Sequence, residues 1–432
     1  MKMANMDDYF DVVIVGTGAA GLYCALNLPA RYRILLLTKQ KADESDSFLA
    51  QGGICMQHGE ADYRPFFDDT MRAGHYENNP ATVDLMIRSS NSIIRDLVRR
   101  GVSFARDDHG ALRFTREGAH SRPRILFHED ITGHEITQTL LNEVLRCENI
   151  ELREHTTLLD FFADASACGG VIAVGPDGEP RAIGAGAVVL ACGGIGGLYK
   201  NSTNFPHITG DAIAMALRHG VACEHLDYIQ IHPTTLYSHR KGRRFLISES
   251  VRGEGALLLD KNGNRFTNEL QPRDVVSAAI RAQMEKDGTD YVWEDMRPIG
   301  EAAIREHFPN ILERCEEEGY DPIHEPIPVV PAQHYFMGGI TADLSSRTAL
   351  PRLYACGETC CNGVHGRNRL ASNSLLESLV FAQRAADDIL YGEPPVFTGD
   401  KPDLAPYREQ ESLFAAYRQE VLTAIERSKN HE

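Results

Sequence analysis

The sequence predicts an α/β fold in which a discontinuous Rossmann-like domain carries an inserted α+β domain and a short C-terminal helical tail. Three observations indicate this fold. A glycine-rich turn joins an apolar strand to a helix near the N-terminus, two more buried strands that lead into glycines follow much later, and the stretch between them mixes short strands with polar turns. At about 150 residues per domain, 432 residues allow two to three such units.

The N-terminal unit has the order strand, turn, helix, strand. Asp11–Val15 is an apolar run rich in β-branched residues, Leu22–Leu28 has helical character, and Arg33–Leu37 is a second buried strand. The glycines of the turn allow the pyrophosphate of a dinucleotide to approach the helix N-terminus, where free N–H groups favour an anion. A turn that only packs the helix on the strand is the alternative, but the complete order favours dinucleotide binding. The turn consists of Gly16, Thr17, Gly18, Ala19, Ala20 and Gly21.

Later segments complete the sheet and its helices. Apolar spacing predicts a helix between Thr82 and Gly101, and buried strands at Ala187–Ala191 and Leu353–Ala355. Asn373 opens a further long helix. We expect residues 1–225 and 337–392 to form the nucleotide-binding domain, 226–336 the inserted capping domain, and 393–432 a proline-containing linker and a C-terminal helix with one apolar stripe.

Composition excludes several classes of protein. The formal net charge of −17 argues against nucleic acid or an anionic membrane surface as the main partner, since both favour a basic face. The longest weakly polar stretch, Ala185–Leu198, is too short to span a bilayer, and Asp7 and Asp8 precede the first apolar run, unlike a signal peptide. The ten cysteines are scattered, which favours a cytoplasmic protein with reduced thiols. An anionic substrate would therefore need a locally basic site.

The end of the second strand departs from the usual dinucleotide-binding pattern. An Asp or Glu commonly stands there to bind the ribose hydroxyls, but this chain has Thr38-Lys39. The substitution disfavours bound NAD and leaves FAD with altered adenosine contacts.

Several motifs, in this order, resemble the succinate dehydrogenase/fumarate reductase flavoprotein family. The resemblance runs from about residue 9 to residue 390, and within the family it is closest to the branch that oxidises L-aspartate at the start of NAD biosynthesis. The motifs are Thr38-Lys39, Ser47–Gly53, His232-Pro233-Thr234, Arg252–Gly255, Pro272-Arg273-Asp274, His334-Tyr335 with Met337-Gly338-Gly339, and Asn368–Leu375.

The resemblance implies a bound FAD. A histidine five residues before the Gln-Gly-Gly holds FAD covalently in membrane-bound succinate dehydrogenases, but Asp46 stands there, so we expect non-covalent FAD. The N-terminus of the Asn373 helix would stabilise the reduced ring. The implied contacts are the glycine turn for the pyrophosphate; Lys39 for the adenosine; Asp46, Ser47, Phe48, Leu49, Ala50, Gln51, Gly52 and Gly53 along the flavin; and Asp211, Glu358, Ser374 and Leu375 for the ribityl chain and isoalloxazine.

The resemblance also implies two clamps for a four-carbon dicarboxylate. His334 and Arg369 would bind one carboxylate, and His232 with Ser248 the other; arginine suits carboxylates because it can bind both oxygens. Gln230 lies two residues before His232, on the same face of an extended segment, and would join them. Arg273 matches the family's proton donor and acceptor. We expect these basic groups to form one cationic pocket.

Glu117 distinguishes the two branches of the family. It lies in Thr115–Arg122, where succinate dehydrogenases carry no acid. L-Aspartate is succinate with an added ammonium group, and a carboxylate offers that ammonium a charged partner. A surface glutamate is the alternative reading.

The implied reaction is hydride transfer from Cα of L-aspartate to flavin N5, which gives iminoaspartate. Dioxygen, forming H2O2, or fumarate would reoxidise the flavin, and the product would pass to quinolinate synthase. A soluble fumarate reductase or succinate dehydrogenase flavoprotein subunit is the main alternative, and a flavin subunit without substrate turnover is another. We expect no metal, because the spacing of Cys356, Cys360 and Cys361 matches no metal-binding motif. The sequence predicts no oligomeric state.

Overall fold

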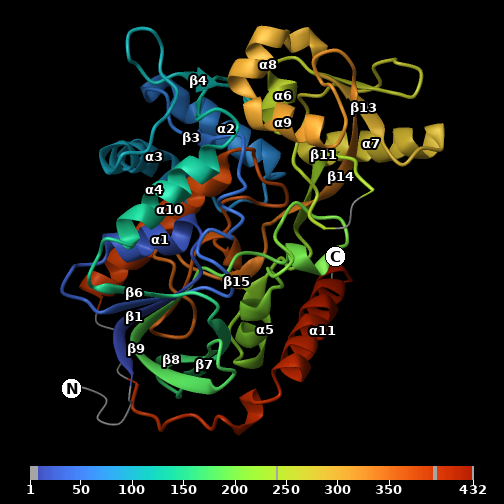
Figure 1. Ribbon diagram of the computed structural model, residues 1–432. Helices are drawn as coiled ribbons and strands as arrows, with labels where there is room; N and C mark the ends of the chain where they lie inside the picture. The colour runs from blue at the N-terminus through green and yellow to red at the C-terminus, as the bar shows by residue number, and fades with distance from the viewer. Residues whose placement is uncertain (1–7, 240–241, 393–396, 431–432) are drawn as a thin grey trace.

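The computed structural model describes residues 8–239, 242–392 and 397–430. Parts of the N-terminal segment, of a basic loop in the inserted domain and of the predicted linker (393–396) lie outside these ranges. A seven-stranded sheet forms the base of the larger domain, with the order β6-β2-β1-β9-β8-β7 and β16 paired with β9 (Figure 1). Its strands are β1 (Tyr9–Val15), β2 (Ile34–Leu37), β6 (Ile150–Arg153), β7 (Thr157–Ala163), β8 (Cys168–Val174), β9 (Pro180–Leu190) and β16 (Leu353–Ala355).

The predicted buried strands are confirmed and lie together at the centre of this sheet. β1 runs parallel to both β2 and β9, and β16 runs parallel to β9. Both faces of β1 are covered: Val12 and Ile14 belong to one core, and Phe10, Val13 and Val15 belong to the other. This two-sided burial explains why the strand reads as a continuous apolar run rather than an alternating one.

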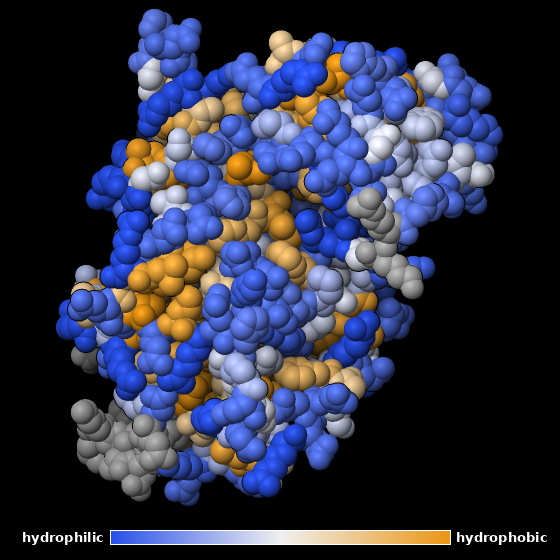
Figure 2. Space-filling view, in the orientation of Figure 1, coloured by the Kyte–Doolittle hydropathy of each residue, from blue (hydrophilic) through white to orange (hydrophobic). Residues whose placement is uncertain are grey.

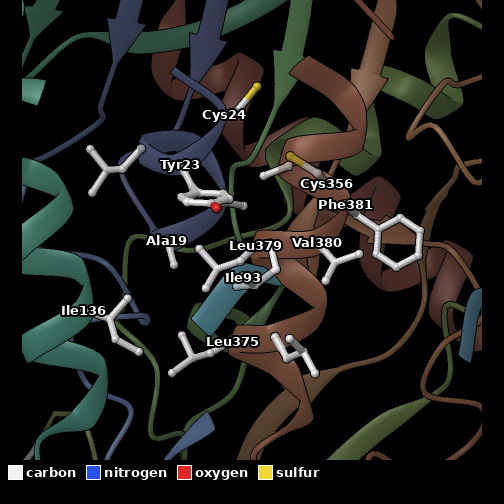
Figure 3. Close-up of a cluster of buried hydrophobic side chains, with 14 of the residues drawn as sticks. Ala19, Tyr23, Cys24, Ile93, Ile136, Cys356, Leu375, Leu379, Val380 and Phe381 are labelled. Carbon is white, nitrogen blue, oxygen red and sulfur yellow. The ribbon is translucent and has the colours of Figure 1, made fainter. Parts of the chain in front are cut away.

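Two groups of helices cover the two faces of the sheet and contribute buried side chains to these cores. Figure 3 shows side chains of the first core, among them Tyr23 of α1 and Leu375, Leu379, Val380 and Phe381 of α10. The predicted helix stop at Gly101 is confirmed, because this residue adopts a left-handed φ of 102°. The first face is covered by α1 (Ala19–Asn27), α2 (Tyr63–Ala73), α3 (Pro80–Arg100), α4 (Thr132–Val144) and α10 (Asn373–Tyr391), and the second by α5 (Asp211–Arg218) and α11 (Gln410–Lys429).

The C-terminal helix α11 packs along α5 on the second face (Figure 1). Tyr417, Val421 and Ile425 of its apolar stripe are buried there. The hydroxyl of Tyr417 donates a hydrogen bond of 2.7 Å to the carbonyl oxygen of Leu159. The stripe therefore serves to dock the helix on the body of the protein.

The inserted segment forms a separate four-stranded antiparallel sheet with its own core (Figure 1). Asp130, from the larger domain, accepts hydrogen bonds of 2.7 Å from the backbone N–H of Ile311 and the side-chain amide of Asn310. It thereby caps the first turn of a helix in the other domain and holds the two together. The elements are β11 (Ile229–Leu236), α6 (Glu249–Gly253), β12 (Leu257–Leu259), α7 (Arg273–Asp287), β13 (Val292–Asp295), α8 (Glu301–His307), α9 (Pro309–Glu317) and β14 (Ile327–Phe336).

Two small sheets complete the larger domain. They consist of β3 (Ile54–Cys55), β4 (Phe114–Thr115) and β5 (Ile125–Leu126), and of β10 (Cys223–Glu224), β15 (Gly339–Thr341) and β17 (Cys360–Cys361).

The surface is mainly polar. Figure 2 shows hydrophilic side chains over most of one face, with hydrophobic residues gathered in the region of α1, α4 and α10. Within the described ranges, none of the helices combines the length and the apolar character needed to cross a bilayer.

Two glycines allow the turn that follows β1 to pack closely, one against helix α1 and the other against the chain that follows β9. A Cβ on Gly21 would lie 1.9 Å from the carbonyl oxygen of Gly16. Gly16 has a left-handed φ of 115°, and a Cβ there would lie 2.0 Å from the carbonyl oxygen of Ala191. Backbone atoms, unlike flexible side-chain ends, cannot move aside without shifting whole elements.

We predict that Gly21→Ala lowers the free energy of unfolding by about 1–3 kcal/mol, because overpacking forces α1 away from β1. Gly175→Ala is the matched control, since a Cβ there has its nearest neighbour at 3.8 Å, and we expect a change within about 0.5 kcal/mol. Urea unfolding followed by circular dichroism measures both. Equal stability of the two variants would contradict the close packing.

Candidate active site

One elongated pocket runs from the glycine turn to the inserted domain. Both domains contribute to its walls, and most of the predicted site residues line it. Those at the nucleotide end and along the middle are Gly16, Thr17, Gly18, Ala20, Lys39, Asp46, Ser47, Leu49, Ala50, Gln51, Gly52, Gly53, Asp211, Glu358, Ser374 and Leu375, and those at the inserted domain are Glu117, Ser248, Arg273, His334 and Arg369.

Three predicted cofactor residues do not line the pocket. Ala19 and Phe48 turn into the core beneath α1, and Gly21 is buried against the glycine turn. Ala19 contributes through its backbone instead, because its N–H donates a 3.0 Å hydrogen bond to the hydroxyl of Ser47. That bond joins the N-terminus of α1 to the neighbouring loop that carries Ser47.

The middle of the pocket presents unsatisfied polar atoms. Ser45 Oγ, Asp46 Oδ2 and Gln51 Oε1 are buried and have no hydrogen-bond partner among the described residues. Buried polar atoms are normally paired, so such a group in a pocket wall marks the place of a polar ligand. The hydroxyls and ring nitrogens of a flavin nucleotide provide donors and acceptors of this kind, so the residues present fit FAD.

Lys39 and Asp211 form an ion pair in the wall of the pocket. The Lys39 ammonium lies 2.7 Å from Asp211 Oδ2 and donates a 3.1 Å hydrogen bond to the carbonyl oxygen of His207. Lys39 follows β2, and both residues line the pocket. The contact of Asp211 with the ribityl chain stays a prediction.

The N-terminus of α10 opens into the pocket through Ser372, Ser374 and Leu375. Its free N–H groups and its dipole favour negative charge. Glu358 lies in the same wall and accepts a 2.9 Å hydrogen bond from the backbone N–H of Phe336. Burial, together with the negative charge of Asp46, raises the pKa of Glu358 well above its usual range. A neutral Glu358 can both donate and accept hydrogen bonds to a ligand hydroxyl.

Two arginines define the end of the pocket at the inserted domain. Arg273 opens α7, and its Nε donates a short hydrogen bond to Glu249 Oε2, while its Nη1 donates a 2.8 Å bond to Gln230 Oε1. The amide of Gln230 in turn donates to the carbonyl oxygen of Arg369 at 2.7 Å and to Asn368 Oδ1 at 2.9 Å. Gln230 therefore does not line the pocket but joins the segments that carry the two arginines.

The Arg369 guanidinium is held on two sides. It lies 4.2 Å from the centroid of the Tyr335 ring, and its Nη1 donates a 2.7 Å hydrogen bond to the hydroxyl of Ser374. Its Nε has no hydrogen-bond partner among the described residues. Burial, followed by the positive charge of Arg273, lowers the pKa of Arg369 to about 10, so it remains charged at neutral pH.

The rings of the two predicted histidines are adjacent, and only His334 lines the pocket. His334 Nδ1 is 2.7 Å from the hydroxyl of Thr203, and the His334 ring lies 5.1 Å from that of His232. His232 does not line the pocket, and its buried Nε2 has no partner among the described residues. Burial, followed by the charge of Arg273, lowers the pKa of both rings well below the usual histidine value. Both are thus neutral, and contrary to expectation the positive charge of the site comes from arginines alone.

Glu117 lies in this same pocket and is almost fully buried. It accepts hydrogen bonds from the hydroxyls of Ser250, at 2.8 Å, and Ser372, at 2.5 Å. A Cβ on Gly52 would lie 2.1 Å from Glu117 Oε1, so the carboxylate rests directly on the Gln-Gly-Gly loop. Burial, followed by the negative charge of Glu249, raises the pKa of Glu117. The reading of Glu117 as a surface residue is therefore wrong.

Sequence reasoning missed Glu249, Ser250 and Thr203. Glu249 directly follows the predicted residue Ser248, and the need of a buried arginine for an acid could have indicated it. Ser372 stood inside the quoted motif without an assigned role. Thr203 is far from His334 in sequence and lies in no motif, so only the fold brings them together.

Comparison with known proteins agrees with this geometry. A model of the FAD binding domain family matches residues 11–375. The L-aspartate oxidase of Clostridium perfringens is 48% identical over 88% of this chain and 86% of that protein, and that of Clostridium acetobutylicum is 44% identical over 96% of each. A solved structure of E. coli quinol fumarate reductase superposes with a TM-score of 0.83 at 31% identity, covering 95% of this chain and 74% of that chain.

These similarities extend across both domains, and they agree with a pocket whose unsatisfied atoms suit a flavin nucleotide. FAD is the cofactor. The chain belongs to the L-aspartate oxidase family of FAD-binding flavoproteins.

Proposed function

We propose that this protein oxidises L-aspartate to iminoaspartate. The observation that carries the proposal is the position of Glu117, a buried acid in the same pocket as Arg273 and Arg369. The arginines suit the two carboxylates of a four-carbon acid, and Glu117 suits its ammonium group. In the route to NAD, the product would pass to quinolinate synthase.

The charges of this end of the pocket match those of L-aspartate. Arg243, Arg273 and Arg369 line it with positive charge, and Glu117 and Glu249 line it with negative charge. With both glutamates ionised, three arginines and two glutamates leave one net positive charge. L-Aspartate, with one net negative charge, neutralises it. A dicarboxylate without the ammonium would leave one negative charge in excess unless Glu117 takes up a proton, and the raised pKa of Glu117 permits this.

The geometry supports a definite orientation of the substrate. Arg369 and His334 would hold one carboxylate, and Ser248 would hold the other, with His232 supporting His334 from behind. Neutral histidines donate single hydrogen bonds, so the two arginines provide the electrostatic attraction.

The glycine turn and the loop 46–53 would hold FAD, which would supply a hydride acceptor for Cα; dioxygen, giving H2O2, or fumarate would take up the electrons. The ammonium must lose one proton as the C=N bond forms, and Glu117 is the base beside it. Arg273 uses Nε and Nη1 for Glu249 and Gln230, which leaves Nη2 without a hydrogen-bond partner among the described residues. That N–H can donate to a carboxylate or, in the fumarate direction, deliver a proton to carbon.

We predict that Glu117→Gln lowers kcat/KM for L-aspartate on the order of 10²-fold, because the ammonium loses its charged partner. Fumarate carries no ammonium, so we expect fumarate reduction to fall by less than about tenfold. Glu294→Gln is the matched control, because burial raises the pKa of this glutamate to about 8 and it does not line the pocket. Steady-state assays of both reactions give the comparison, and an equal loss of the two activities would remove Glu117 from this role.

The pH dependence provides a second test. Glu117 must be ionised to hold the ammonium, and its pKa is raised above the usual value of 4.5. We therefore expect kcat/KM for L-aspartate to fall as the pH decreases through this raised pKa, and the acidic limb to disappear in Glu117→Gln. An acidic limb of the pH profile that persists unchanged in Glu117→Gln would show that another group titrates there.

We also predict that acid precipitation releases all the FAD. Asp46 occupies the position of the covalent histidine, and a carboxylate does not form that bond. Flavin absorbance is expected in the supernatant after precipitation with trichloroacetic acid and centrifugation. Flavin that stays with the pellet would contradict non-covalent binding.

A further inference from the structure

A second cluster of chemically reactive side chains lies outside the pocket. Glu224, His225 and Cys361 each offer one potential metal-ligand atom, and these three atoms lie within 4.8 Å of one another. Glu224 and Cys361 belong to β10 and β17, the outer strands of the three-stranded sheet β10-β15-β17, and His225 directly follows β10. None of the three lines the flavin and substrate pocket.

The Glu224 and His225 side chains of this cluster form no polar interaction with another described residue. No hydrogen bond or ion pair engages the Glu224 carboxylate or the His225 imidazole, and both side chains are exposed. Two other histidines at the surface are paired with acids, His75 with Asp274 at 2.9 Å and His219 with Asp160 at 3.0 Å. The ring of His225 is instead stacked on Tyr228, with the centroids 4.3 Å apart.

We propose that Glu224, His225 and Cys361 bind a divalent cation of the zinc class. A thiolate, an imidazole and a carboxylate together suit Zn2+ or Co2+, whereas Mg2+ and Ca2+ prefer oxygen ligands alone. The ligands come from two edges of a small sheet, so modest movements of the exposed Glu224 and His225 can bring them onto a metal anchored at the buried Cys361.

Three protein ligands leave one position of a tetrahedral site open. Water fills it, since Glu224 and His225 are exposed to solvent. Binding replaces the S–H bond of Cys361 by a metal–sulfur bond and releases one proton to solvent, with no change of oxidation state.

The expected effect of the metal is to tie β10 to β17. Since β17 follows directly on the segment that carries Glu358, the cation would brace one wall of the flavin pocket without entering it. Any molecule that binds only the folded state raises the unfolding temperature. The site thus predicts metal-dependent stability of the holoenzyme.

The test uses Co2+ as a spectroscopic probe on the FAD-loaded enzyme, treated with a chelator and kept reduced with a phosphine. We expect one equivalent of Co2+ to give tetrahedral ligand-field bands in the red, where oxidised flavin does not absorb, and one equivalent of Zn2+ to abolish them. Calorimetric titration with Zn2+ gives the affinity. We expect Cys361→Ser and His225→Ala each to weaken it by at least about tenfold.

Cys147→Ser is the matched control, because this half-buried thiol does not belong to the cluster and donates a hydrogen bond to the carbonyl oxygen of Glu143, at 3.4 Å. It should leave the bands and the affinity unchanged. Flavin content and the unfolding temperature without metal report folding, and His225→Ala, at the surface, keeps the test valid should Cys361→Ser fail to fold. Absence of the bands in the parent enzyme, or full bands in His225→Ala or Cys361→Ser, would overturn the site.

Discussion

The buried carboxylate of Glu249 is the interaction on which the rest of the site depends. It lies against Arg273 and 3.6 Å from Arg252, and nearby arginines keep its pKa below the usual value. Without this acid, two guanidinium groups would be buried with no countercharge, at a cost of several kcal/mol. Burial and the charge of Glu249 together raise the pKa of Glu117, so the two buried acids are electrostatically linked.

One end of the pocket lies where the larger domain meets the inserted segment, and a few polar contacts hold the two in register. Gln230 joins Arg273 to the backbone of Arg369, and Asp130 caps the first turn of α9 across the boundary. Both contacts satisfy buried donors that would otherwise be costly. The positions of Arg273 and Arg369 relative to each other therefore depend on how the inserted segment docks on the larger domain.

Much of this arrangement was predictable because several local patterns agreed. The apolar run of β1, the glycine turn and the helix after it predict a dinucleotide site on steric grounds, and Gly16 and Gly21 indeed stand where a Cβ would strike backbone. The ion pair of Asp211 with Lys39, at 2.7 Å, was not predicted because the two residues are distant in sequence. The neutrality of His232 and His334 was missed because a pKa depends on burial and on neighbouring charges, and neither is visible in a motif.

By itself, the sequence determined the order of strands and helices, the position of the glycine turn and the set of residue types that suit FAD and a dicarboxylate. These follow from periodicity and from steric limits that act over a few residues. Only the tertiary structure decided which side chains face one another. Glu249 lies on Arg273, and Glu117 lies against Gly52 and accepts a hydrogen bond from Ser372. The physical reason is that electrostatic interactions and desolvation depend on distances through space, and those distances are set when the two domains pack.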